Sequence, residues 1–208
     1  MKYVTELNIP IIPKMAPEVV ETVYDKMNDP ENGCGPFRVF KQNVDKRMLK
    51  FIDDLGCEVM FAEGYQSGPR NGRVGVHKDG CFNRPDRVKL NFTYGDEHSY
   101  FDFYKVKDES KIKTVYLGMQ RSTQYDFLDN SAKIHHYITE DDNLEHEFTY
   151  QNNHKWHLAR IHEFHGSRNL GVVPRKTIAL ILRRKDDPEG KWISWDEAHE
   201  IFKDYITF

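Results

Sequence analysis

One short run of the chain reads Gly75-Val76-His77-Lys78-Asp79-Gly80. It lies in a region whose short apolar stretches, separated by turn residues, are typical of β-strands. In an extended strand, residues two apart project from the same face. His77 and Asp79 are therefore expected to point the same way, where an imidazole and a carboxylate can bind one metal ion. By itself a His-x-Asp triplet is also found in ordinary surface turns.

The sequence on both sides of this run predicts a series of short strands. We expect them at 58–63, 72–77, 88–94, 100–106, 114–119, 146–150, 157–161 and 177–183. The stretches 107–113 and 140–143 are expected to be loops. Because no helix is expected between these strands, the series favours antiparallel sheets arranged as a barrel or sandwich.

Helices are expected towards both ends of the chain. The segments 16–27 and 44–55 carry apolar residues at helical spacing. A third helix is expected at 194–205, where Ser194 and Glu197 form a capping-box pattern ahead of an apolar stripe.

The length and composition suit one globular domain. The chain has 208 residues, of which 38% are hydrophobic and 30% are charged. We expect a single domain over 1–208, in which 1–71 forms a helical and strand support. The β core is expected at 72–185 and the C-terminal helix at 186–208.

Charge and cysteine content restrict the class of partner. With 30 Lys and Arg against 33 Asp and Glu, the net charge of −3 gives no electrostatic reason to expect nucleic-acid binding. Cys34, Cys57 and Cys81 do not form a disulfide framework and suit a reducing compartment. The N-terminus does not resemble a signal peptide, and no apolar run is long enough to span a bilayer. We expect a soluble, cytoplasmic protein with no membrane partner; its oligomeric state is open.

A second segment, 162–177, supplies further polar groups. His165 precedes a turn that contains Gly171, and Arg175 opens an apolar strand about ten residues later. If the strands on either side of the turn are neighbours, His165 and Arg175 can line one cavity. Two histidines and one carboxylate form the facial triad of non-haem iron(II) oxygenases. The planar fork of Arg175 suits a carboxylate, and Thr177 on the same strand face adds a hydroxyl.

Together the two segments resemble the iron(II)- and 2-oxoglutarate-dependent dioxygenase superfamily. That family's pattern is His-x-Asp, a distant His, and an Arg about ten residues after it. The stretch from His165 to Thr177, which reads HGSRNLGVVPRKT, is similar to that of phage-type and aspartyl/asparaginyl hydroxylase-like members. The resemblance covers roughly 74–183.

The resemblance implies a mainly β fold with flanking helices, built on a double-stranded β-helix (a cupin-like jelly roll). It also implies that iron(II) is held by His77, Asp79 and His165. 2-Oxoglutarate would be bound by Arg175 and Thr177, and ascorbate is a further possible cofactor. The implied reaction couples oxidative decarboxylation of 2-oxoglutarate by dioxygen to hydroxylation of a substrate. A peptide side chain, an amino acid and a small metabolite all stay open as substrates.

Other residues compete with this assignment. His162 is a rival for the place of His165, but on a regular strand it would face the other way, so it is interpreted as a supporting or surface residue. The other histidines of the β region are interpreted as surface or strand-face residues: His135, His136, His154 and His157. Asn91 and Tyr104 are further candidates for contact with the keto acid.

Two alternative functions come from other classes. One is a cupin-like metalloenzyme that uses the same three ligands without 2-oxoglutarate, although such chemistry has no need of Arg175 and Thr177. The other is a non-catalytic jelly roll with a structural or binding role, which predicts no dependence on metal.

Overall fold

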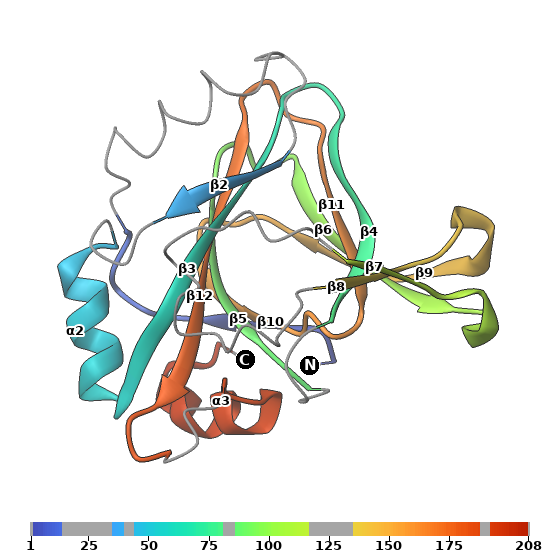
Figure 1. Cartoon of the computed structure of the whole chain (residues 1–208). Coiled ribbons are helices and arrows are strands. Elements are labelled where there is room, and N and C mark those ends of the chain that lie inside the picture. Colours follow the sequence, from blue (N-terminus) through green and yellow to red (C-terminus); the bar gives the residue numbers. More distant parts are fainter. Residues whose placement is uncertain are drawn as a thin grey trace.

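The computed structural model describes residues 2–13, 35–39, 44–80, 86–116, 135–187 and 192–207. Over these residues the chain is mainly β, with two six-stranded antiparallel sheets and two α-helices (Figure 1). We refer to the sheets as sheet A and sheet B. Sheet A has the order β1-β10-β5-β12-β3-β2, and sheet B has the order β7-β8-β4-β11-β6-β9.

The strands of sheet A are β1 (Val4–Leu7), β10 (Trp156–Ala159), β5 (Lys89–Tyr94), β12 (Arg175–Arg184), β3 (Cys57–Ser67) and β2 (Gly35–Val39). Those of sheet B are β7 (Lys113–Tyr116), β8 (His135–Ile138), β4 (Gly72–Gly80), β11 (Phe164–Asn169), β6 (Ser99–Val106) and β9 (Leu144–Gln151). The helices are α2 (Lys46–Asp54) and α3 (Trp195–Ile201). Single 3-10 turns cover Glu109–Lys111, Asp141–Asn143 and Lys203–Tyr205.

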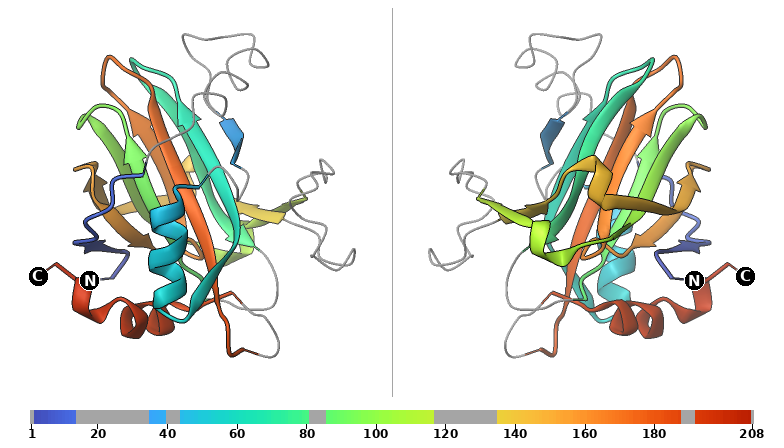
Figure 2. Two further views of the ribbon diagram at one scale, coloured as in Figure 1. Left: turned by 90° about the vertical axis from the view of Figure 1, so that its left-hand side faces the viewer. Right: turned by 90° about the vertical axis from the view of Figure 1, so that its right-hand side faces the viewer.

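Eight of the strands pair in a nested pattern. The outermost pair is β3 with β12, followed by β4 with β11, β5 with β10, and β6 with β9. Successive strands from β3 to β6 also alternate between sheet A and sheet B. The chain therefore runs as one long antiparallel ribbon that is rolled over so that its two sheets face each other (Figures 1 and 2).

The outer face of sheet A carries the larger hydrophobic core, which the two helices cover (Figure 2). Met48 and Ile52 of α2 are fully buried there, and so is Phe202 directly after α3. The Asp45 carboxylate accepts a hydrogen bond from the Arg47 N–H and caps α2. The capping box expected at the start of the C-terminal helix is present between Ser194 and Glu197. Both helices thus contribute side chains to the core on the outer face of sheet A.

The inner face of sheet A is polar at one end. On β12, Ile178 and Leu180 belong to the outer core, whereas Arg175 and Thr177 are buried on the other face. A similar alternation on β5 places Leu90 in the outer core and its neighbours Lys89 and Asn91 between the sheets. A buried polar lining is unfavourable unless it is paired or binds a ligand, so this end of the sandwich is suited to hold a ligand.

The expectation of antiparallel β structure is confirmed, and each of the eight expected strands overlaps an observed one. Four strands were not expected from the sequence: β1, β2, β8 and β11. The expected helix at 44–55 is α2, and both expected loops contain a 3-10 turn. The helix expected at 16–27 lies outside the described residues, as do Cys34 and Cys81. Cys57 is buried as a free thiol. Among the described residues, no helix is long and apolar enough to cross a membrane.

Candidate functional site

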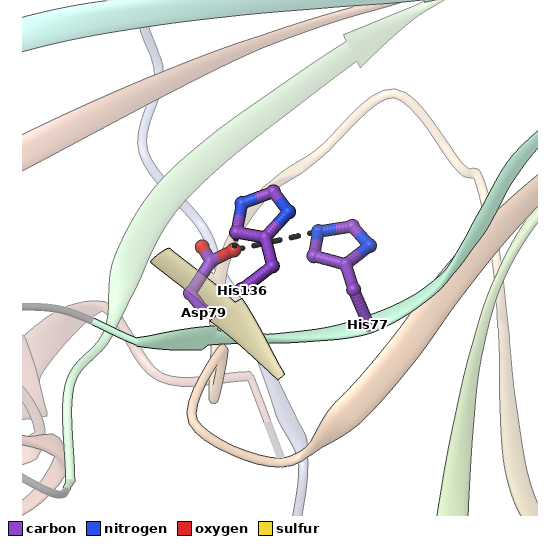
Figure 3. A group of neighbouring side chains, drawn as sticks. All are labelled: His77, Asp79 and His136. Carbon is purple, nitrogen blue, oxygen red and sulfur yellow. Dashed lines mark ion pairs between the residues drawn. The ribbon is translucent and has the colours of Figure 1, made fainter. Parts of the chain in front are cut away.

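The centre of the site is the pair predicted from the His-x-Asp run. Both side chains project from β4 to the same side, and His77 Nε2 lies 3.4 Å from Asp79 Oδ1 (Figure 3). Their side chains are only 12% and 9% exposed. The strand spacing thus does bring the imidazole and the carboxylate together.

A second imidazole reaches the same carboxylate oxygen from β8. The register of β8 against β4 places His136 opposite Asp79, and His136 Nε2 lies 3.3 Å from Asp79 Oδ1 (Figure 3). The rings of His77 and His136 are stacked with centroids 4.4 Å apart. Donor atoms of His77, Asp79 and His136 all lie within 4.8 Å of one another.

The third predicted ligand, His165, lies on the other side of His77. The two residues are register partners between β11 and β4, and their ring centroids are 4.6 Å apart. His165 is outside the tight group formed with His136, an imidazole that was not among the ligands predicted from the sequence. The described part of the chain therefore gathers three imidazoles and one carboxylate at this point.

Hydrogen bonding orients two of these rings. His77 Nδ1 lies 2.7 Å from the Gly75 carbonyl oxygen, and His165 Nδ1 lies 2.8 Å from that of Glu163. A carbonyl can only accept, so each Nδ1 carries the proton and Nε2 is left as the donor to a metal. Burial lowers the pKa of His165 to about 3, which keeps this ring neutral.

The contacts of Asp79 fit a divalent metal ion. Its Oδ1 is buried without a hydrogen bond, although two Nε2 atoms lie at 3.3 and 3.4 Å. A charge-assisted hydrogen bond would be shorter, at about 2.7–2.9 Å. Two donors that share one metal at about 2.1 Å are about 3.0–3.4 Å apart for octahedral to tetrahedral angles. Two histidines and a carboxylate are also the donor set of non-haem iron(II) sites.

The other oxygen of Asp79 is held by a buried lysine that the sequence analysis missed. Lys89 Nζ lies 2.7 Å from Asp79 Oδ2 and 2.7 Å from Glu63 Oε2, and the Tyr65 hydroxyl donates to Glu63 at 3.1 Å. Burial alone would raise the pKa of Asp79, but Lys89 and His77 outweigh it and hold that pKa well below 3.8. Asp79 is thus ionised, with one oxygen occupied and the other directed at the imidazoles.

His77, His165, Lys89 and Tyr65 line a cavity between the two sheets. Its polar lining includes His77, His165, Lys89, Asn91, Arg175 and Thr177. Its apolar walls are Val74, Phe101, Ile161 and Ala179. The predicted keto-acid anchors Arg175 and Thr177 therefore share a cavity with two of the predicted metal ligands.

Arg175 is a buried cation with an incomplete set of partners. It is 5% exposed, and its Nη1 donates to the Ser167 hydroxyl at 3.3 Å. Burial lowers the pKa of Arg175 to about 10, which leaves the group charged at neutral pH. Within the described residues no carboxylate lies within ion-pair distance of it. Thr177 faces the same cavity, with its hydroxyl 2.8 Å from that of Thr93. A buried guanidinium without a counter-ion is suited to bind an anionic ligand.

Of the remaining residues that the sequence suggested for the site, Asn91 lines the cavity, whereas Tyr104 and His162 do not. Asn91 lines the cavity and its Oδ1 is buried without a partner, whereas Tyr104 packs edge-on against His146. His162 does not line the cavity; its Nδ1 lies 3.5 Å from the Arg87 carbonyl.

Two histidines that the sequence suggested only as surface or strand-face residues, His157 and His136, lie at or beside the site. His157 lies on the face of β10; it is 2% exposed and lies beside Arg175 in a small adjoining pocket. His136 does lie on a strand, but no local pattern shows that this strand pairs with the His-x-Asp run. Only the long-range pairing of β8 with β4 reveals its place in the site.

Comparisons with family profiles, curated proteins and solved structures gave no match to this chain. The site is therefore defined by its own geometry: a cluster of imidazoles and a carboxylate suited to a divalent metal, beside a buried arginine suited to an anion.

Proposed function

We propose that the protein is an iron(II)- and 2-oxoglutarate-dependent dioxygenase that hydroxylates a substrate C–H bond. The observation that carries the proposal is that Arg175, a buried cation without a carboxylate partner among the described residues, shares one cavity with His77 and His165. A metal centre and a cation in one cavity match a ligand that binds the metal at one end and carries a carboxylate at the other.

The strand pairing supports a double-stranded β-helix, or jelly roll, as the fold of this enzyme. Such a fold is a long antiparallel hairpin rolled into two facing sheets. The nested pairs β3–β12, β4–β11, β5–β10 and β6–β9 have this arrangement. Within it, β4 and β11 are neighbours in sheet B, and this is what brings His165 to His77.

The charges in the cavity favour a dianionic cosubstrate. Lys89 and Arg175 contribute two positive charges, and Asp79 and Glu63 contribute two negative charges, so these four groups are balanced. A divalent metal would leave a net charge of +2 in a buried space, and such a charge is unfavourable without compensation. A dicarboxylate such as 2-oxoglutarate restores neutrality, whereas a keto acid with one carboxylate does not.

The residues can be given specific roles. His77, Asp79 and His165 would hold the iron, which when bound supplies the oxidative chemistry for decarboxylation of the keto acid and hydroxylation. Arg175 binds the distal carboxylate through its planar fork, with the Thr177 hydroxyl as a second donor. Lys89 holds one oxygen of Asp79 and so fixes the direction of the other.

The apolar residues of the cavity complete the site. Val74, Phe101, Ile161 and Ala179 form apolar walls beside the charged groups, and a ligand bound between them would displace water from those groups. Exclusion of water strengthens the attraction between Arg175 and a carboxylate, because the effective dielectric constant is lower.

His136 favours one second candidate. If it joins His77, Asp79 and His165 permanently, the site becomes a three-histidine, one-carboxylate centre of a cupin-like metalloenzyme that does not use 2-oxoglutarate. Four protein donors leave two positions of an octahedral ion free, too few for a bidentate keto acid and dioxygen together. This alternative leaves the buried charge of Arg175 without a function, so we prefer the dioxygenase.

Anaerobic titration separates the two proposals. The protein is loaded with iron(II), and 2-oxoglutarate is added while binding is followed by calorimetry and visible absorption. The dioxygenase requires saturable binding with one equivalent of keto acid and a new charge-transfer band that depends on both components. Asp79→Ala should lose the band, and Arg175→Met should lose the affinity. Tight iron binding with no response to 2-oxoglutarate would instead favour the cupin-like enzyme.

A further inference from the structure

The hairpin formed by β7 and β8 lies outside the nested ribbon, yet it supplies a side chain to the metal cluster. β8 pairs with the end of β4 through Lys78–Tyr137, Asp79–His136 and Gly80–His135 (Figure 1). On its other side β8 pairs with β7. Of these three pairs, the middle one brings an imidazole onto the carboxylate of the site (Figure 3).

His136 is placed as a donor as favourably as His77 is. Their Nε2 atoms approach the same Oδ1 of Asp79 at 3.3 and 3.4 Å, and their rings are nearly parallel, with an interplanar angle of 21°. These distances indicate that a metal bound to Asp79 Oδ1 would take an imidazole from β8 as well as one from β4. With His165, which the proposed function also assigns to the metal, the site would have four protein donors.

Four donors conflict with the chemistry proposed above, because an octahedral ion would keep only two positions. A bidentate keto acid and dioxygen together need three. We propose that His136 is a displaceable ligand, which binds the metal while the cavity lacks 2-oxoglutarate and withdraws when the keto acid binds. This inference rests on the proposed dioxygenase function and adds a control on when its metal becomes accessible.

The structure indicates why His136, rather than His77, would be the ligand that leaves. β4 has nine residues and lies between β8 and β11, so it is held on both sides. β8 has four residues, and the His136 side chain is 22% exposed against 12% for His77. The β7–β8 hairpin can shift without breaking any of the four nested strand pairs.

The test counts imidazole ligands directly. The full chain is loaded with copper(II), and pulsed electron paramagnetic resonance measures the number of bound imidazoles before and after 2-oxoglutarate is added. The wild type should show three imidazoles alone and two with 2-oxoglutarate. His136→Ala should show two under both conditions. His98→Ala, which removes an exposed imidazole from the turn between β5 and β6, should behave as the wild type.

Calorimetry with manganese(II) gives an independent readout. Without 2-oxoglutarate, His136→Ala should bind the metal at least about 10-fold more weakly, since loss of even an outer partner of a ligand has an effect of that size. With the metal bound, the same variant should bind 2-oxoglutarate more tightly than the wild type, because no ligand has to leave. Thermal unfolding followed by circular dichroism checks that each variant is folded.

The outcomes separate this inference from the function on which it rests. Two imidazoles in the wild type under both conditions, or three under both while 2-oxoglutarate binds, would overturn the displaceable ligand and leave the dioxygenase standing. Failure of 2-oxoglutarate to bind the wild type and His136→Ala alike would overturn the dioxygenase, and the inference with it.

Discussion

Replacement of Arg175 by methionine should stabilise the ligand-free protein and at the same time abolish its response to 2-oxoglutarate. Burial lowers the pKa of Arg175 from 12.5 to about 10. Because the folded state holds this proton less favourably than the unfolded chain does, the charged group destabilises the fold at neutral pH. At about 1.4 kcal/mol per pKa unit, the penalty is about 3 kcal/mol. Methionine fills a similar volume without a charge.

The assay is thermal unfolding at pH 7 with and without metal and 2-oxoglutarate, under anaerobic conditions with manganese(II). For a domain of this size, a gain of about 3 kcal/mol raises the melting temperature by about 6–12 °C. At a 2-oxoglutarate concentration of 100 times Kd, the wild type should gain about 2.7 kcal/mol and the variant nothing.

Lys176→Met is the matched control, since it removes a cation from the opposite face of β12. It should keep the full response to 2-oxoglutarate. The reasoning is refuted if Arg175→Met is less stable than the wild type and is still stabilised by 2-oxoglutarate, because Arg175 would then be a structural residue with a partner.

Three further predictions concern the groups around the site. Lys89→Met should lower the free energy of unfolding by about 3–5 kcal/mol in urea denaturation because it leaves Asp79 and Glu63 buried without their cation; addition of Glu63→Gln should recover part of the loss, and strictly additive effects would contradict the network. Burial lowers the pKa of His157 to about 4, so only the unfolded chain takes up a proton as the pH falls below 6.5. Stability should therefore decrease by up to about 3 kcal/mol between pH 6.5 and 4, and His157→Gln should decrease less over that range; equal slopes would show that another group is responsible. Asn169→Ala should lower the free energy of unfolding by about 2–4 kcal/mol in the same assay and weaken 2-oxoglutarate binding. The Asn169 side-chain amide donates hydrogen bonds to the carbonyl oxygens of Gly68 and Val173 and so secures the loop before Arg175. Unchanged keto-acid affinity in a destabilised variant would limit Asn169 to a structural role.

Local patterns were sufficient to predict much of the architecture. The apolar run along 178–182 and the turn residues between strands predicted β structure, and the pair Ser194 and Glu197 predicted the start of α3. The spacing of His77 and Asp79 predicted a shared direction because a strand has a period of two residues.

The rest depends on contacts between distant parts of the chain. β11 reads FHGSRN, whose glycine and polar residues hide a strand that is buried because it lies between β4 and β6. β8 is recognisable only from its pairing with β4 and β7, so the place of His136 beside Asp79 could not be predicted. Lys89 reads as an ordinary surface lysine until Glu63 and Asp79, from two other strands, are brought within 2.7 Å of it.

The most direct test of the proposed function is turnover of 2-oxoglutarate itself. The protein is incubated aerobically, without any added substrate, with iron(II), ascorbate and 2-oxoglutarate labelled at the carboxylate next to the keto group. The labelled carbon dioxide and the unlabelled succinate that form are both measured. The account predicts slow, equimolar release of both products, which stops with a chelator and is absent in Asp79→Ala. If the wild type binds iron yet releases neither product at any iron or 2-oxoglutarate concentration, the protein is not a 2-oxoglutarate-dependent dioxygenase.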